Sequence, residues 1–504
     1  MRRLLVILGW TAFGIVTAYT LALSVFAFLD PGWKPHRVET AWFLFSFAFL
    51  VGLVRCLRPS ALSPDSQSQP WATPGFWWLA FVMALACGAY GRALAVGFLS
   101  DDFVLLELHD LGAGWRHGTS QFLRVLPVWL LQAADGVGPA WSPVLVHAIN
   151  VALHLFNGSL LFGIARRLQL GTSPSVLAAA LFLLFPASPE AVVWASGLQD
   201  VLMATASLGF VLATLQARHP VVLLGCLVIG LLSKETAVVM PLLAAAALWA
   251  RGTRSTPVVA RTLAACALAA VVFGVWRIQS GGGTFAIAPT RYLVKEILAT
   301  AFGTLAVPWT TDELRLTALV GIVMASVVAL GAWLILTGRA TWTAARVAAL
   351  GVAWVVLSVA PVYSLFFVSN TLEGSRYLYL PSAGWAVLLS GVSSLAGSRP
   401  GRVFRWALYG VVALWAISTH GHVRTWRRAA AERDRIITAA MAVRAPDCAA
   451  VAFVGATDNV SGAYVFRNGL EPALRRAGLR SVVDQTAPIG CVFTWTGETF
   501  VRSR

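Results

Sequence analysis

The chain has 504 residues, of which 58% are hydrophobic and only 12% are charged, and its mean hydropathy is +0.74. A soluble protein cannot cover so much apolar surface with so few charges, so this composition excludes an ordinary soluble protein and indicates a polytopic helical membrane protein. Arginine carries most of the net charge of +16 and falls mainly between apolar runs, which favours membrane lipid headgroups over nucleic acid as the anionic partner.

Residues 1–75 are expected to form an N-terminal region of two transmembrane helices and a cytoplasmic linker. Arg2 and Arg3 precede about 26 mainly apolar residues, a run too long for a cleavable signal peptide, so we expect a retained first span at 4–29 with a cytoplasmic N-terminus. A second apolar run follows at 40–57, and residues 60–74 have the composition of a flexible polar linker.

Further apolar runs long enough to cross a bilayer follow along the chain. They lie at about 76–98, 141–165, 174–188, 199–216, 258–277, 313–337, 347–368, 377–396 and 404–421. The apolar segment 220–250 is interrupted by Ser233, Lys234 and Glu235, which predicts a hairpin of two short spans. The expected fold class is therefore an all-α polytopic membrane protein with about 13 transmembrane helices.

The arginines favour one orientation in the membrane. They fall in alternate loops if residues 291–310 do not cross, and loops rich in arginine face the cytoplasm. We therefore interpret 291–310 as an interfacial or re-entrant helix. This orientation predicts an integral plasma-membrane protein whose loop 99–140 and C-terminal region 424–504 are extracytoplasmic; in loop 99–140, a short helix is expected at 126–133.

The C-terminal region 424–504 has a different character from the rest of the chain. Charged residues alternate with short apolar runs at 450–454, 481–483 and 491–494, and a helical pattern covers 470–477, which predicts a small α/β appendage. If this region is extracytoplasmic, Cys448 and Cys491 are able to form a disulfide. The spacing of the cysteines fits no zinc motif.

Two adjacent carboxylates, Asp101 and Asp102, follow directly on the predicted span 76–98 and should lie at a membrane surface. They are the candidates for chemistry in the first hundred residues of the predicted membrane region. The alternative is that Ser100 and the two aspartates cap a short helix beginning near Phe103, because Ser and Asp side chains accept hydrogen bonds from free N–H groups there.

Other polar residues recur in or beside the predicted spans, where ionisable groups are costly and usually pair or serve a site. His147 belongs to a set spaced by three and four residues, which places the set on one helix face: His147, Asn150, His154 and Asn157. These side chains either contact substrate or hydrogen-bond neighbouring helices as structural contacts.

Four more charged residues are expected at the outer ends of spans: Glu190, Asp200, Lys234 and Arg376. A local ion pair between Lys234 and Glu235 is the structural alternative for the lysine, and Arg376 alternatively extends its guanidinium to the interface from an otherwise apolar site. Arg124 and Arg291 add further cations on the same side.

This combination of carboxylates and cations suits sugar transfer from a lipid-linked donor. A carboxylate removes the proton from an acceptor hydroxyl as that hydroxyl attacks the anomeric carbon. The leaving polyprenyl phosphate is already an anion, so it needs cations and not an acid.

Five motifs in order between about residues 98 and 396 resemble the GT-C class of polytopic glycosyltransferases. The resemblance is closest to the O-mannosyltransferase-like branch, which includes the eukaryotic transmembrane-and-TPR mannosyltransferases and bacterial relatives. The motifs are Ser100-Asp-Asp-Phe103, His147-Ala-Ile-Asn-Val-Ala-Leu-His154, Phe185-Pro-Ala-Ser-Pro-Glu-Ala-Val192, Leu232-Ser-Lys-Glu235 and Ser375-Arg-Tyr-Leu-Tyr-Leu-Pro-Ser382.

The resemblance implies an inverting transferase that uses a polyprenyl- or dolichyl-phosphate sugar, with residues 76–423 as its catalytic transmembrane domain. Asp101, and after it Asp102, would be the catalytic base, and Lys234 or Arg376 would bind the donor phosphate. We expect sugar or acceptor contacts from Glu190, Asp200 and His147. Members of this branch generally use no divalent metal, so no metal or other cofactor is expected.

The chain departs from the family pattern in two ways. Two extra spans precede the one that leads into the aspartate loop, and neither tetratricopeptide repeats nor a β-trefoil follows the membrane region, so the protein acceptors tied to those modules are not implied. The C-terminal appendage, which includes the segment Tyr464–Leu470, is instead a candidate for acceptor recognition. The acceptor is a protein hydroxyl, a cell-envelope glycan or a lipid.

The competing hypothesis is a transporter or flippase of lipid-linked sugars. Transporters often consist of two related halves with charges near mid-membrane, whereas this sequence shows no duplication and places its charges on one side. A third hypothesis is a degenerate family member that acts only as an assembly scaffold, against which the intact Asp101-Asp102 pair argues.

Overall fold

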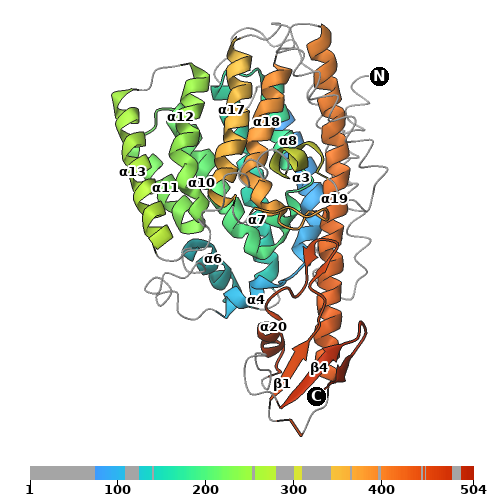
Figure 1. Cartoon of the computed structure of the whole chain (residues 1–504). Helices are drawn as coiled ribbons and strands as arrows, with labels where there is room; N and C mark the ends of the chain where they lie inside the picture. Colours follow the sequence, from blue (N-terminus) through green and yellow to red (C-terminus); the bar gives the residue numbers. More distant parts are fainter. Residues whose placement is uncertain are drawn as a thin grey trace, which may run out of the picture.

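The computed structural model describes residues 74–107, 124–138, 141–252, 256–279, 300–308, 342–363, 366–394, 399–443, 447–448, 450–479 and 490–503. Within these ranges the chain is mostly helical, with a small region of strands near the C-terminus (Figure 1). The predicted spans 4–29, 40–57 and 313–337, the linker 60–73, the strand 481–483, Arg291 and most of the segment 291–310 lie outside the described residues.

Long helices form a bundle, and short helical segments connect them. The helices are α3 (Pro74–Tyr90), α4 (Asp101–Leu106), α6 (Val125–Asp135), α7 (Ser142–Arg167), α8 (Thr172–Leu183), α9 (Pro189–Val193), α10 (Leu198–Leu215), α11 (Pro220–Ser233), α12 (Met240–Arg251), α13 (Pro257–Gln279), α15 (Phe302–Ala306), α17 (Trp342–Val359), α18 (Tyr379–Ser393) and α19 (Arg399–Ala442). Single turns of 3₁₀ helix cover η2 (Gly91–Ala95), η4 (Ala195–Gly197), η5 (Glu235–Val239), η9 (Ala360–Val362) and η10 (Ser375–Leu378).

Five stretches among the described helices are long and apolar enough to cross a membrane. They are Gly75–Ala95, Ser142–Arg167, Ala195–Leu215, Pro257–Val275 and Thr343–Val362. Each falls on a predicted span, which supports the general prediction of a helical membrane protein. The number of 13 helices and the orientation stay predictions.

The predicted break in the segment 220–250 is present. Helix α11 ends at Ser233, Lys234 adopts an extended backbone, and α12 begins at Met240 after the η5 turn. Pro241 at the start of α12 lacks an N–H group, which favours a helix N-terminus at this point. The break places Lys234 and Glu235 at the turn, as the sequence predicted.

The bundle is packed closely enough for helix backbones to approach one another. Helices α17 and α18 pack side by side, and a Cβ atom added at Gly384 would lie 2.7 Å from the Cβ of Trp354. Small residues allow such approaches between helices in membranes. Helix α10 packs against α7, α11 and α12 and is buried along most of its length.

Helix α19 is longer than the predicted span 404–421. It continues without a break to Ala442, so the expected domain boundary at 424 falls inside a helix. Residues 422–442 contain no glycine or proline and are rich in alanine and arginine, which have high helix propensity. The helix runs along the bundle and on to the C-terminal sheet (Figure 1).

The end of the chain forms the predicted α/β appendage. Strand β1 (Val451–Val454) pairs in parallel with β4 (Cys491–Trp495), and β4 pairs antiparallel with β5 (Phe500–Arg502). A short antiparallel pair, β2 (Asn459–Val460) and β3 (Ala463–Tyr464), and helix α20 (Leu470–Arg476) complete it. Strands β1 and β4 and helix α20 confirm three of the predicted elements.

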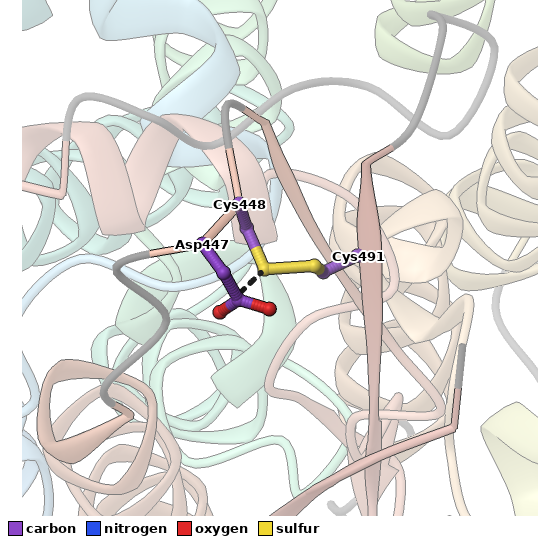
Figure 2. Close-up of side chains that lie close together, drawn as sticks. All are labelled: Asp447, Cys448 and Cys491. Atoms are coloured by element: carbon purple, nitrogen blue, oxygen red, sulfur yellow. Dashed lines mark hydrogen bonds between the residues drawn. A yellow bond between two sulfur atoms is a disulfide. The ribbon is translucent and has the colours of Figure 1, made fainter.

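A disulfide joins Cys448 to Cys491 and so links the segment before β1 to the first residue of β4 (Figure 2). This is the pairing that the sequence allowed. Asp447 lies beside the two sulfurs, and the three side chains are close enough together for a metal site. Both sulfur atoms belong to the disulfide, so the cluster offers no thiolate to a metal.

Loss of this disulfide should loosen the appendage. The double variant Cys448→Ser/Cys491→Ser removes a crosslink between residues 43 apart, and such crosslinks typically contribute about 2–4 kcal/mol. We expect faster proteolysis within 443–504 than in wild type, with Cys226→Ser as the control. Thiol alkylation of denatured, unreduced wild-type protein that labels both Cys448 and Cys491 would contradict the assignment.

Candidate functional site

The two adjacent aspartates face different surroundings. Helix α4 begins at Asp101 itself, and successive helical side chains point about 100° apart, so the two carboxylates diverge. Asp101 is half-buried, whereas Asp102 is fully buried. The Asp102 carboxylate accepts hydrogen bonds from Leu99 N at 2.8 Å, from Ser196 N at 2.7 Å and from the Ser196 hydroxyl. Asp102 therefore joins the α4 turn to η4, and Asp101 is the member of the pair with access to a ligand.

Burial raises the pKa of Asp102 from 3.8 to about 7, and the hydrogen bonds from Ser196 and Leu99 only partly oppose it. The folded protein therefore holds this proton more tightly than the unfolded chain. The stabilisation of the fold that comes from this raised pKa is complete below about pH 4, and it is lost as the pH rises to about 7. Glu190 changes in the same direction, because burial raises its pKa to about 7 despite nearby Arg376.

The replacement Asp102→Asn should therefore flatten the dependence of stability on pH. In detergent, the thermal midpoint of wild type should fall between pH 4 and pH 7, and the variant should lose part of this slope because it cannot ionise at this position. Asp458→Asn, which changes an exposed carboxylate, serves as the control. A variant slope equal to that of wild type would show that Asp102 does not titrate in this range.

The loop before α4 is held by contacts from distant parts of the chain. Arg433 of α19 donates from Nη1 to the carbonyl oxygens of Val96 at 3.1 Å and Phe98 at 2.6 Å. The buried His147 ring of α7 lies 3.0 Å, through Nε2, from the Gly97 carbonyl oxygen. These contacts fix the path of the chain into Asp101.

The appendage also packs on the aspartate loop. Ser100 N donates to the Val465 carbonyl at 3.0 Å, and Asn468 N donates to the Ser100 hydroxyl at 3.3 Å. Gly469 has φ of +82°, and a Cβ added there would lie 2.3 Å from the Ser100 carbonyl oxygen. A side chain at residue 469 would therefore disturb this contact. Figure 1 shows the appendage at the same end of the bundle as α4 and α6.

Two cavities meet at Asp101. The first, about 350 Å³, has apolar walls from α4 and α6, including Val104 and Val128, and Arg124 at its edge; we call it the apolar cavity. The second, about 280 Å³, is lined by charged and aromatic side chains, among them Arg376, Arg467 and Tyr377; we call it the arginine cavity. Asp101 and Asn468 line both cavities.

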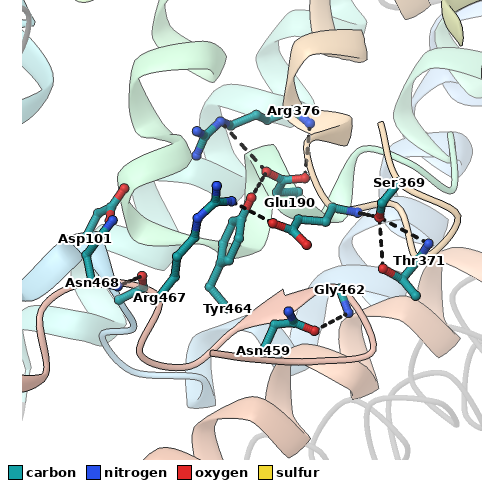
Figure 3. A network of polar contacts seen from close by, with 12 residues as sticks. Asp101, Glu190, Ser369, Thr371, Arg376, Asn459, Gly462, Tyr464, Arg467 and Asn468 are labelled. Atoms are coloured by element: carbon teal, nitrogen blue, oxygen red, sulfur yellow. Dashed lines mark hydrogen bonds and ion pairs between the residues drawn. The ribbon is translucent and has the colours of Figure 1, made fainter. Parts of the chain in front are cut away.

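Arg376 is the predicted cation that lines the arginine cavity. It is 17% exposed, and its Nε is 3.8 Å from Glu190 Oε1 (Figure 3). Its guanidinium stacks over the ring of Trp194, with Cζ 4.7 Å from the ring centre. Burial opposes its charge, but Glu190 and Tyr377 raise the pKa of the guanidinium above its usual value. Nη1 is buried and has no hydrogen-bond partner among the described residues.

Glu190 is buried and holds in place the turn that precedes α18. Its carboxylate accepts hydrogen bonds from the Ser375 hydroxyl at 3.2 Å, from Arg376 N at 3.4 Å and from the Tyr464 hydroxyl at 3.4 Å. The last contact comes from the appendage (Figure 3). The observed role of Glu190 is thus to orient Arg376 and Tyr464, and a contact with sugar or acceptor stays a prediction.

The other two predicted charges form a buried ion pair. Lys234 Nζ lies 2.5 Å from Asp200 Oδ1, and the two side chains are 2% and 3% exposed. Glu235 is paired with Arg124 at 3.1 Å. Neither Lys234 nor Asp200 lines the two cavities, although Lys234 lies 4.9 Å from the centre of the Tyr377 ring, which lines the arginine cavity.

The polar face of α7 makes structural contacts. Asn150 Nδ2 donates to the Trp194 carbonyl at 3.1 Å, and Asn157 Nδ2 donates to the Tyr379 hydroxyl at 3.2 Å. The His154 ring Nδ1 is 2.7 Å from the same hydroxyl. These contacts match the structural alternative that the sequence left open. A direct contact of His147 with substrate stays a prediction.

The structure thus gathers most of the predicted residues at one end of the bundle. Asp101 and Arg376 share a cavity, Glu190 contacts Arg376, and Lys234 lies against the Tyr377 ring. Three further residues were not predicted individually: Trp194, Arg467 and Asn468. The only sequence signal for the last two was their position inside the segment Tyr464–Leu470.

Comparison of the chain with protein-family models, with curated proteins and with solved structures gave no match. The resemblance to the GT-C class therefore rests on the five motifs and their order.

Proposed function

We propose that this protein is an inverting glycosyltransferase that moves a sugar from a polyprenyl-phosphate carrier to a hydroxyl acceptor. One observation carries the proposal: the accessible carboxylate of Asp101 stands where two cavities meet, with Arg124 in one cavity and Arg376 in the other. A carboxylate flanked by two cations provides a base for the acceptor and charge for a leaving phosphate.

The apolar cavity suits the first isoprene units of the donor. Its walls carry Val104, Val128 and Leu131 beside the charged groups of Asp101 and Arg124. Burial lowers the pKa of Arg124, but Glu235 and Asp200 together raise it above its usual value, so the guanidinium stays charged. We assign the donor phosphate to the space between Arg124 and Arg376. Lys234 then acts indirectly, by neutralising Asp200.

The reaction that we propose is a single displacement. The Asp101 carboxylate removes the proton from the acceptor hydroxyl, and the hydroxyl oxygen forms a bond to the anomeric carbon of the sugar. The bond between that carbon and the phosphate oxygen breaks on the opposite face, which inverts the anomeric configuration. Polyprenyl phosphate leaves as an anion and is stabilised by the two guanidiniums.

The same proposal places the site on the extracytoplasmic face of the plasma membrane. The appendage contains a disulfide, and disulfides persist in oxidising compartments. It lies at the end of the bundle that holds α4 and α6 (Figure 1). Both observations support an outward-facing site for the donor.

The test is donor consumption by purified protein in liposomes. Radiolabelled polyprenyl-phosphate mannose and a panel of other lipid-phosphate sugars are supplied with a cell-envelope extract as the source of acceptors and with water as the simplest acceptor. We expect one donor to lose its sugar. Movement of an intact donor across the bilayer without consumption would instead favour the transporter hypothesis.

A further inference from the structure

Asp101 accepts a hydrogen bond from a side chain of the appendage. Asn468 Nδ2 donates to Asp101 Oδ1 at 2.7 Å (Figure 3). The two residues are 367 positions apart in the chain, and they are the pair that lines both cavities. A side chain of the appendage therefore contacts the carboxylate to which we assign the chemistry.

The contact restricts the carboxylate without blocking it. Asp101 lies in the first turn of a short helix, where a half-buried side chain has several rotamers. The amide group engages Oδ1, which is the side-chain hydrogen bond of Asp101 among the described residues, and Asp101 lines both cavities. Such a donor holds the carboxylate in one orientation, as a general base requires.

The side chain of Asn468 has this role separately from the docking of the appendage. Docking uses main-chain groups: Ser100 N with the Val465 carbonyl, Asn468 N with the Ser100 hydroxyl, and the close contact of Gly469. Exposed ion pairs add to it, including Arg475 with Glu107 at 2.7 Å. A variant that changes only the Asn468 side chain keeps all of these contacts.

We propose that Asn468 is a positioning residue that holds Asp101 in its reactive orientation, which makes the appendage a component of the active site. This inference rests on the proposed function, because it assumes that Asp101 acts as a base. Beyond the proposed function, the inference states that residues of both the membrane domain and the appendage form the site.

The experiment compares Asn468→Ala and Asn468→Asp with Asp458→Asn, an exposed change in the same appendage, in the full-length protein. Donor consumption is measured with polyprenyl-phosphate mannose and with water as the acceptor. We expect Asn468→Ala to lower kcat about 10-fold with little change in donor KM, since one hydrogen bond of about 1.4 kcal/mol is lost. Asn468→Asp should move the acidic limb of the pH–rate profile to higher pH, because two adjacent carboxylates hold a shared proton.

A second readout does not depend on activity. Carbodiimide labelling of Asp101, followed by mass spectrometry, should be faster in Asn468→Ala than in wild type or Asp458→Asn, because the carboxylate is released. Equal labelling, or a loss of kcat matched by an equal loss of folded protein, would overturn the positioning role. Wild-type protein that consumes no donor, with labelling still dependent on residue 468, would reject the proposed function but leave the contact in place.

Discussion

The variant Asp101→Asn should lose at least about 100-fold in sugar transfer while it still binds the donor, because general-base catalysis contributes typically 10²–10⁴-fold. Asparagine has nearly the shape of aspartate but cannot accept the acceptor proton. Within the described part of the chain, the Asp101 side chain makes one hydrogen bond, to Asn468, so the substitution should disturb the fold little. Transfer and donor binding are measured on the same reconstituted preparation.

The matched control for this variant is Glu107→Gln, at the end of the same helix. Glu107 contacts Arg475 of the appendage and lines neither cavity, so this change removes a nearby negative charge without touching the site. We expect nearly wild-type transfer. If both variants lose transfer equally, surface charge and not a base at residue 101 explains the effect.

The variant Lys234→Met should destabilise the protein by about 3–5 kcal/mol, because removal of one partner leaves a buried charge without compensation. Lys234 and Asp200 are 2.5 Å apart and almost inaccessible to solvent, so water cannot replace the ammonium group. The midpoint of thermal unfolding in detergent measures the loss. Arg502→Met, which removes an exposed ion pair with Asp447, should leave the midpoint nearly unchanged.

The double variant Lys234→Met/Asp200→Leu separates the charge effect from packing. Replacement of both members of a buried pair by apolar residues is often neutral or stabilising, so the double variant should recover most of the stability. If the double variant is less stable than Lys234→Met, the charges of Lys234 and Asp200 do not mainly compensate each other. Such a result would indicate that each residue has a separate partner in the folded protein.

Much of the helical architecture was predictable because it depends on local composition. Apolar runs of sufficient length gave spans that coincide with five described helices, and the break at Lys234 followed from three polar residues in an apolar segment. The end of α19 was not predictable in the same way. Its apolar run ends near residue 421, but the helix continues to Ala442, where it packs against β2, β3 and α20 of the appendage.

The candidate site was predictable as a collection of residues but not as a geometry. Charges at predicted outer ends of spans do lie together, since alternating helices return to the same end of a bundle. The partner of Lys234 is Asp200, 34 positions away, which sequence spacing alone does not indicate. The different burial of Asp101 and Asp102 depends on Ser196, and the contact with Asn468 depends on how the appendage docks.

The most direct test of the central claim is to quantify, in one reconstituted sample, the sugar transferred from polyprenyl-phosphate mannose and the polyprenyl phosphate released, for wild type and for Asp101→Asn. The account predicts equal molar amounts of the two products with wild type and almost none with the variant, at similar donor binding. Equal product formation by the two proteins would show that Asp101 is not the base, and intact donor on the opposite side of the bilayer with neither product formed would contradict the transferase itself.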